Sequence, residues 1–245
     1  IFYDQITKEY VARFSGIGTC TETDIVVATI YKGFPVKYVS DSALKDNTTV
    51  KSIVLRAPIV SIQGYAFRGC TALESITFPE TLESISKYVF YECRSLRSLT
   101  FPESLTHLYY EQFYRCDSLE SIYIPRNLTE GVALYGCPAL KTIKVHPDNP
   151  VYSDEGNCLI NKETKTLLHI LNNSTIPADG SVEIIGESSF ACYTRDKLVL
   201  PEGVKGFELG AIMDNKNIVS IHFPSTFTEL GSYFLSGCTN IEKIT

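Results

Sequence analysis

The chain has 245 residues, of which 44% are hydrophobic, and its net charge is −6. This apolar content is enough for a continuous core, whereas the acidic balance argues against a nucleic-acid-binding protein, which needs a basic surface. No run of about 18 apolar residues occurs, so the sequence predicts no membrane span. The chain begins at Ile1 without a signal peptide, and we interpret it as a mature or trimmed chain.

Residues 1–35 lack the repeat that occupies the rest of the chain. The β-branched residues between Ile25 and Ile30 favour a strand, and the glycines before them favour a turn. A repeat fold has an apolar surface at each end, and a capping segment must cover it. We therefore predict that residues 1–35 form an N-terminal cap.

A repeat of about 23 residues runs through residues 36–245. In its clearest copy, an aromatic residue, a Cys, several aliphatic residues and a final Pro stand at positions that recur in the next two copies. A fixed period of this length is the signature of a solenoid, in which each coil buries its apolar face against its neighbours. The matched positions of that copy are Ile62, Phe67, Cys70, Leu73, Ile76, Phe78 and Pro79.

Each coil is predicted to contain a strand, an extended return segment and one short turn. Apolar and polar residues alternate from Ile76 to Phe78, which is the period of a strand with one buried face. Pro79 ends this strand because proline cannot donate the next ladder hydrogen bond. The segment before each Cys is too short for a full helix, so we expect a helical or 3-10 turn there. The predicted fold class is an α/β repeat solenoid with a parallel β ladder and short helical or 3-10 turns.

The repeat is interrupted between Cys137 and Cys192, which stand 55 residues apart in the sequence. Two regular periods would be shorter, so this region contains an insertion. Two apolar runs, at residues 158–160 and 166–170, flank a polar stretch. This pattern predicts a β-hairpin insertion near residues 147–170.

Six of the eight Cys residues are interpreted as one repeat position, which places them in a row along the solenoid. We favour buried free thiols because free Cys packs as a small hydrophobe, although coils about 4.8 Å apart would also allow disulfides. No Cys-x-x-Cys pair occurs and the four His residues are scattered, so no metal site is predicted. The row comprises Cys70, Cys93, Cys116, Cys137, Cys192 and Cys238, with Asn47 and Asn215 at two further copies.

The stretch from Ala66 to Pro79 resembles the repeat of the BspA-like leucine-rich repeat family, which has Ala-Phe, Cys, Leu and a final Ile-Pro at the same spacing. Residues 149–156 resemble an insertion common in that family. The resemblance covers roughly residues 25–245 and implies a right-handed leucine-rich repeat superhelix. Many members are exported bacterial proteins and some are adhesins. The resemblance thus implies an extracellular or cell-surface location, and host or bacterial surface proteins or glycans as partners.

Outward-facing side chains of the predicted strands form the first candidate binding surface, because solenoids bind through rows of such side chains. The candidates are Thr77, Thr100, Tyr123 and Lys144. Ordinary β-propensity on a solvated face is the alternative explanation for this row.

A second candidate row stands two residues before the repeat Cys, where consecutive copies carry Tyr91, Tyr114 and Tyr135, with Tyr88, Tyr109 and Tyr110 nearby. Exposed Tyr suits recognition of protein or carbohydrate because its side chain is large, rigid and amphipathic. The alternative is that each ring only covers the turn beneath it.

No catalytic motif is found: the sequence has neither Gly-x-Ser-x-Gly, nor His-Glu-x-x-His, nor a phosphate-binding loop. We therefore predict a non-catalytic protein-protein or cell-surface interaction module of adhesin-like type, with no cofactor. The alternative is a structural spacer that displays another domain. The two hypotheses differ in one property, since a spacer needs no exposed aromatic patch.

Overall fold

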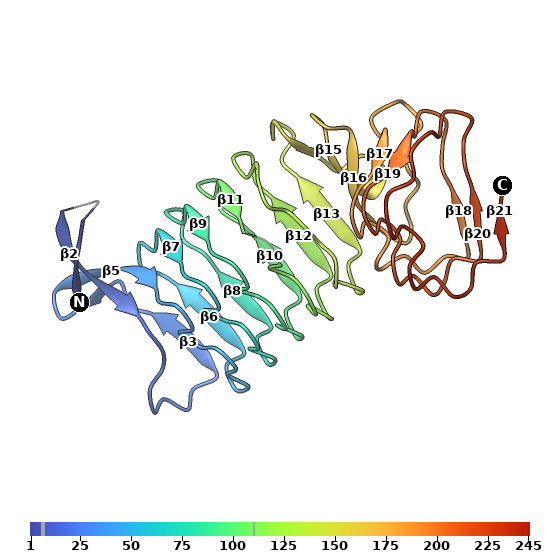
Figure 1. The fold of residues 1–245 in the computed structure, drawn as a ribbon. Coiled ribbons are helices and arrows are strands. Elements are labelled where there is room, and N and C mark those ends of the chain that lie inside the picture. The colour runs from blue at the N-terminus through green and yellow to red at the C-terminus, as the bar shows by residue number, and fades with distance from the viewer. Residues whose placement is uncertain (6–7, 110) are drawn as a thin grey trace. The chain divides into compact units, whose positions relative to one another are not determined.

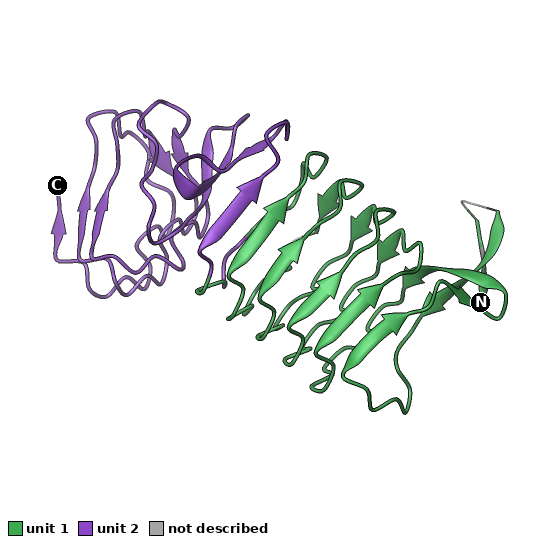
Figure 2. Ribbon diagram, turned by 180° about the vertical axis from the view of Figure 1, so that it is seen from behind, with its two compact units in different colours: residues 1–133, 137–139 green, residues 134–136, 140–245 purple. Residues whose placement is uncertain are grey.

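The computed structural model describes residues 1–5, 8–109 and 111–245 (Figure 1). They form two compact units, which Figure 2 distinguishes by colour. Unit 1 comprises residues 1–133 with 137–139, and unit 2 comprises residues 134–136 with 140–245. Each unit is built from coils whose strands pair mainly in parallel, so the predicted β-solenoid with a parallel ladder is confirmed.

The first row of strands in unit 1 follows the predicted alternation of buried and exposed residues. Ile53 pairs with Ile76 and Leu99 pairs with Ile122, and all four side chains are buried. Residues one repeat apart therefore stack in register on the core side of the ladder. This row consists of β3 (Asp24–Val27), β6 (Ser52–Leu55), β8 (Ser75–Thr77), β10 (Ser98–Thr100) and β12 (Ser121–Ile124).

A second row of strands, most of them short, forms the return side of the unit 1 coils. Its members pair in parallel and are β5 (Phe34–Val39), β7 (Ser61–Ile62), β9 (Ser84–Ile85) and β11 (His107–Leu108). Before them, β1 (Phe2–Asp4) pairs antiparallel with β2 (Glu9–Phe14), and β4 (Ile30–Tyr31) pairs antiparallel with β5. The assignment of residues 1–35 as a cap stays a prediction.

Phenylalanine rings fill the core of unit 1 between the two rows. Phe67, Phe90 and Phe113 are buried, and their ring centroids are 6.1 and 6.3 Å apart along the stack. Such separations are typical of favourable aromatic pairs. The aromatic residue of the repeat therefore supplies both the buried area and the spacing between successive coils.

The turns are not helical, so the expected α/β class and the helical or 3-10 turns are not confirmed. The described residues contain one helix, the short 3-10 helix η1 (Glu155–Asn157). In the turn before Cys70, residue Tyr65 has a φ of 57° and Gly69 has a φ of 70°. Left-handed residues interrupt a right-handed helix, so the i→i+3 bond from Arg68 N–H to Tyr65 O stays an isolated turn.

The Cys row links successive turns through thiol hydrogen bonds. The Sγ atom of Cys93 donates to Phe67 O at 3.2 Å, and that of Cys116 donates to Phe90 O at 3.2 Å. The eight Cys residues are thiols and not disulfides. Asn215 shows why asparagine can replace cysteine, since its Nδ2 atom donates to Phe190 O at 2.9 Å.

Cys192 does not belong to this row, which corrects the sequence interpretation. In the regular coils the row residue stands three positions after the core aromatic, as Cys70 does after Phe67, and its N–H bonds back to that residue. After Phe190 that position is Tyr193, whose N–H donates to Phe190 O at 3.0 Å. The Tyr193 ring is buried against Phe190, with centroids 5.1 Å apart.

Unit 2 contains the hairpin region and the last coils. β14 (Tyr152–Ser153), β15 (Cys158–Asn161) and β16 (Thr166–Ile170) pair antiparallel, and β16 then pairs in parallel with β17 (Ile184–Ile185). The ladder continues from β17 to β19 (Gly206–Phe207). The remaining strands are β13 (Thr142–Val145), β18 (Lys197–Val199), β20 (Ser220–His222) and β21 (Lys243–Ile244).

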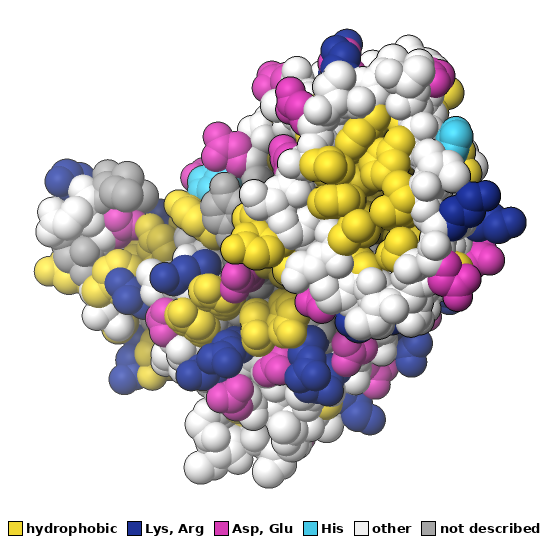
Figure 3. Space-filling view, turned by 45° about the vertical axis from the view of Figure 1, so that its right-hand side comes forward, with side chains coloured by type: hydrophobic (Ala, Val, Ile, Leu, Met, Phe, Trp, Pro, Cys, Tyr) yellow, Lys and Arg dark blue, Asp and Glu magenta, His cyan; other side chains and the backbone are white. Residues whose placement is uncertain are grey.

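The last coil of unit 2 leaves apolar side chains uncovered. Leu230, Tyr233 and Ile244 are exposed, and Phe223 and Phe234 are only partly buried. Figure 3 shows hydrophobic side chains gathered on the end of unit 2 that carries β21. This surface is the cross-section of the solenoid core.

Candidate binding surface

Tyrosine rings from successive coils form a continuous patch on unit 1, which we call the aromatic surface (Tyr65, Arg68, Tyr88, Tyr91 and Tyr114). Tyr65 and Tyr88 stack with ring centroids 5.2 Å apart and an interplanar angle of 10°. Tyr88 meets Tyr91 edge-on at 5.8 Å, and Tyr91 lies 5.0 Å from Tyr114. The four rings thus form an unbroken chain of contacts.

Arg68 adds a cation to this patch. It occupies the repeat position that carries Tyr91 and Tyr114 in the next coils. Its guanidinium carbon lies 5.3 Å from the Tyr91 ring centroid and 5.9 Å from that of Tyr65. These distances are within the range of cation–π attraction, which holds the guanidinium over the rings.

A hollow of about 290 Å³ lies within the patch, lined by Tyr65, Arg68, Tyr88, Tyr91 and Glu111. A hydrogen bond to the Glu111 side chain, together with the negative charge of that carboxylate, raises the pKa of the Tyr88 hydroxyl. The hollow therefore combines aromatic walls with polar groups of both signs. Such a lining suits an amphipathic ligand.

Two rings of the aromatic surface are attached to strained backbone. Tyr65 and Tyr88 have φ values of 57° and 60°, and Gly210 holds the same turn position in unit 2. A left-handed conformation costs a non-glycine residue about 1–2 kcal/mol, and a bulky side chain there is an outlier. The same turn position also has a positive φ in other copies, at Ser42, Glu111, Ser188 and Tyr233. The left-handed conformation therefore belongs to the turn of the repeat, and it fixes where the Tyr65 and Tyr88 rings stand.

The structure brings together only part of the predicted tyrosine row. Tyr91 is half-buried and Tyr114 is 39% exposed, and they are neighbours on unit 1. Tyr135 is half-buried and belongs to unit 2, whereas Tyr110 lies outside the described residues.

Tyr88 was predicted to lie near the tyrosine row, whereas Tyr65 is the ring of the aromatic surface that the sequence interpretation missed. A signal was present, because Tyr65 and Tyr88 both stand five residues before the repeat Cys. The position two residues before the Cys was the clearer pattern, since three copies in succession carry Tyr there. Only the folded turn shows that the two positions lie side by side.

The predicted strand-face residues lie on the ladder and not on the turns. Thr77 and Thr100 are exposed on unit 1. Tyr123 is half-buried, and its hydroxyl donates to Glu103 Oε1 at 3.1 Å; burial and this hydrogen bond raise the pKa of Tyr123. Lys144, on unit 2, is exposed and lies 3.4 Å from Asp154 Oδ2. Their role in binding stays a prediction.

The thiols of Cys70, Cys93 and Cys116 are buried, as expected of core residues and not of reactive cysteines. Burial raises the pKa of the Cys70 and Cys116 thiols to about 12 and that of Cys93 well above its usual value. Among the described residues, no group of three or more His, Cys, Asp or Glu side chains could hold a metal ion. No helix in that part of the chain has the length and apolar character that a bilayer crossing requires.

Solved structures of leucine-rich repeat proteins resemble this chain in fold. A leucine-rich repeat protein from Eubacterium ventriosum is 23% identical with a TM-score of 0.73, and the match covers 91% of this chain and 59% of that one. The pneumococcal vaccine antigen PcpA is 17% identical with a TM-score of 0.63, with coverages of 90% and 59%. The leucine-rich repeat protein TpLRR of T. pallidum is 18% identical with a TM-score of 0.51, with coverages of 91% and 79%.

This chain spans less than two thirds of the first two structures, and at these identities the likeness establishes the fold alone. No curated protein matches the chain. The model of the BspA type leucine-rich repeat region, however, matches six copies over residues 37–155 and 160–245, which is most of the sequence. The chain therefore belongs to the BspA type leucine-rich repeat family.

Proposed function

We propose that this chain is a non-catalytic interaction module of an extracellular or cell-surface protein, and that the aromatic surface of unit 1 is its contact site. Leucine-rich repeat proteins are commonly protein-interaction modules, which supports the general class. The observation that carries the site is the unbroken contact of four Tyr rings.

The composition of the aromatic surface favours binding over a purely structural role. Tyr and Arg are enriched in protein interfaces and among the residues that dominate binding energy. Tyr rings give a large contact area and lose little conformational entropy when bound. The partner is a surface protein or glycan of host or bacterial origin, recognised through ring faces with polar groups at their edges.

A binding screen tests this proposal. The chain would be screened against extracellular-matrix proteins and a glycan array, beside a double variant, Tyr88→Ser with Tyr91→Ser. We expect at least one partner whose binding falls by about tenfold or more in the double variant, as for residues at the centre of an interface. The melting temperature of each protein would be measured to exclude unfolding.

Tyr233→Ser is the matched control. Tyr233 is 71% exposed, stands in unit 2, and has a φ of 57° at the same turn position as Tyr65 and Tyr88. Its replacement removes an exposed ring from equally strained backbone, so it should leave the binding unchanged. If Tyr233→Ser weakened binding as much as the double variant does, a specific role for the aromatic surface would be refuted.

A structural spacer is the alternative, and the same screen distinguishes it. A spacer has no need of an exposed aromatic patch, so it would bind nothing in the screen, and Tyr88→Ser with Tyr91→Ser would change stability alone. That result would overturn the interaction proposal for this chain.

A further inference from the structure

The first row of strands in unit 2 is broken on one side of β18. β18 pairs in parallel with β20, through Leu198 and Ile221, and it is the end strand of its sheet. The preceding coil should supply a strand at residues 173–175, because Pro177 and Pro201 end equivalent segments. The structure has no strand there.

Side chains explain why this segment leaves the ladder. Ser174 stands where the next coils have the apolar residues Leu198 and Ile221, and it is buried with its Oγ atom donating to Asn157 O at 3.0 Å. The Sγ atom of Cys158 lies 3.6 Å from Thr175 O. The segment is therefore held against residues 157–158, away from β18.

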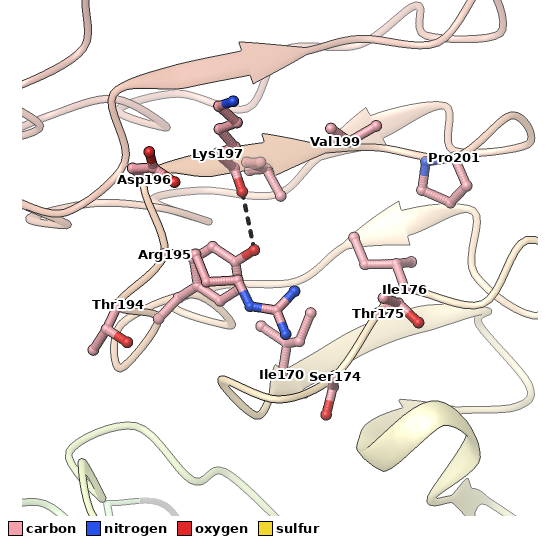
Figure 4. Close-up of a pocket in the computed structure, with 12 residues that line it drawn as sticks. Ile170, Ser174, Thr175, Ile176, Thr194, Arg195, Asp196, Lys197, Val199 and Pro201 are labelled. Atoms are coloured by element: carbon pink, nitrogen blue, oxygen red, sulfur yellow. Dashed lines mark hydrogen bonds between the residues drawn. The ribbon is translucent and has the colours of Figure 1, made fainter.

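The backbone of β18 presents unused ladder groups to the resulting gap. Asp196 O accepts from Val219 N at 2.7 Å, and Leu200 N donates to His222 O at 3.0 Å, so these residues face β20. Alternate residues of a strand point their N–H and C=O groups to opposite sides, and Lys197 and Val199 therefore face the gap. Lys197 O accepts the Tyr193 hydroxyl at 3.1 Å (Figure 4). Among the described residues, the Lys197 N–H and both Val199 groups have no strand to pair with.

A hollow of about 680 Å³ occupies the gap. In Figure 4, Ser174, Thr175 and Ile176 lie across it from Val199 and Pro201. This volume is within the roughly 300–1,000 Å³ of ligand-binding clefts. The hollow therefore has room for a short extended segment beside a strand edge that lacks a partner.

The rim of the hollow carries more positive than negative charge, although the whole chain is acidic. Arg195 and Lys197 stand there with Asp196. The Nε atom of Arg195 donates to Asn172 O at 2.6 Å, and this hydrogen bond holds the guanidinium group in place. The guanidinium group points toward Ile170 and Ser174 in Figure 4. An acidic side chain placed in the hollow would find a positioned partner.

We propose that this hollow binds an extended, acidic peptide segment of a partner protein, which adds a strand to the free edge of β18. Strand addition to an exposed sheet edge takes affinity from main-chain hydrogen bonds and specificity from side-chain pockets. Lys197 and Val199 supply the main-chain groups, Ile170 and Ile176 contact an apolar side chain, and Arg195 pairs with a carboxylate. No residue of the aromatic surface takes part, so the proposal holds whether or not that surface binds a ligand.

The test uses the full chain and a phage-displayed library of random linear peptides. We expect enrichment of peptides that combine β-branched and acidic residues, and the best of them would be synthesised for affinity measurement. Val199→Pro removes the N–H that faces the gap but no ladder bond to β20, a position where an edge strand tolerates proline. The affinity should fall by about tenfold, the effect of roughly one lost hydrogen bond.

Three further measurements keep the test independent of how Val199→Pro folds. A peptide N-methylated at alternate residues cannot donate to β18 and should bind wild type about tenfold more weakly than its parent. Hydrogen exchange of the Lys197 and Val199 amides should slow when the parent peptide is bound. Arg195→Glu should weaken binding of the acidic peptides, whereas Arg56→Glu, an exposed arginine in unit 1, is the matched control and should not.

The proposal would be overturned if the library yielded no enriched peptide. It would equally be overturned if neither of the two alternate sets of peptide residues, when N-methylated, weakened binding, since strand addition requires the N–H groups of one set. Binding that is lost in Tyr88→Ser with Tyr91→Ser, and kept in Val199→Pro, would assign the peptides to the aromatic surface and refute the site at β18.

Discussion

The coils of unit 1 and those of unit 2 are built from one repeat but differ in regularity. In unit 1 the ladder positions recur every 23 residues, as in the pairs Ser75 with Ser52 and Ser121 with Ser98. In unit 2, residues 173–175 leave the ladder and β18 has one free edge. The first row of unit 1 is also divided, between β8 and β10, but these two strands contact each other, whereas a hollow lies beside β18. A stretch whose coils stay in contact presents mainly side chains to a partner. An interrupted stretch also presents its backbone.

Truncation of a core Phe should have the largest effect on stability, and the size of this effect should differ between the two units. Phe90 stacks between Phe67 and Phe113, whereas Phe190 lies against one ring, that of Tyr193, in the part of the chain that the structure describes. Phe90→Ala should lower the free energy of unfolding by about 3–5 kcal/mol, the usual range for a buried Phe. Phe190→Ala should lower it by less, because fewer rings lose their partner. Denaturant unfolding monitored by circular dichroism measures both, and an equal or reversed order would contradict the comparison.

The pH dependence of stability should be a property of unit 2, through His169. This side chain is buried in β16, and burial lowers its pKa from 6.5 to about 4. Its imidazole is protonated below pH 6.5 in the unfolded chain but stays neutral in the fold, so stability is lost as the pH falls from 6.5 to 4. The loss reaches about 3 kcal/mol at pH 4.

His169→Leu should remove that part of the pH dependence, as measured by unfolding midpoints between pH 7 and pH 4. His222→Leu, at an exposed position on β20, is the control and should keep the wild-type slope. If His169→Leu kept the full slope as well, the dependence would have to come from other groups.

Two glycines with similar backbone angles should show how closely the coils of unit 1 approach. Gly131 has a φ of 81°, and a Cβ atom added there would lie 1.5 Å from Leu108 O. Gly180, in unit 2, has a φ of 87° and nothing within 4 Å of an added Cβ. Both Ala variants carry the left-handed penalty of about 1–2 kcal/mol, but Gly131→Ala must also displace the backbone of the neighbouring coil.

We therefore expect Gly131→Ala to lower the unfolding free energy by at least about 1 kcal/mol more than Gly180→Ala does. Thermal unfolding of the two variants, compared with wild type, measures the difference. Equal losses would mean that the return strands of unit 1 can separate at little cost.

Alkylation of the cysteines is expected to perturb the protein least, because the accessible thiol is modified while the chain stays folded. Cys20 is exposed, whereas Cys93 and Cys116 are buried and burial raises their pKa values. The thiolate is the reactive form, so at pH 8 an alkylating reagent should modify Cys20 first and the other two only after unfolding. Mass spectrometry of digests identifies the sites. Early modification of Cys93 would show that the coils of unit 1 open locally.

Sequence periodicity was sufficient to predict the ladder. The apolar positions Ile53, Ile76, Leu99 and Ile122 recur at the repeat length, and a strand has only two faces, so one set of residues had to face the core. Periodicity was insufficient for the turns, because a short segment has no period. The left-handed residues Tyr65 and Tyr88 were therefore predicted within helical or 3-10 turns.

Residue identity was misleading where it competed with spacing. Cys192 matched the Cys row by type, but Tyr193 stands at the required three residues after Phe190. The backbone hydrogen bond of the turn selects the position, and thiol, amide and phenol side chains all fit it. A spacing rule that counts from the core aromatic residue would have placed Tyr193 correctly.

The sequence by itself determined the solenoid, its repeat length and the tyrosines at recurring turn positions, because each coil must bury the same face in the same way. Only the tertiary structure decided which of these tyrosines meet, since Tyr88 and Tyr91 become neighbours through the bend of a turn. It also decided that β18 has a free edge. That edge depends on a hydrogen bond from Ser174 to Asn157, between residues distant in sequence, which no local pattern encodes.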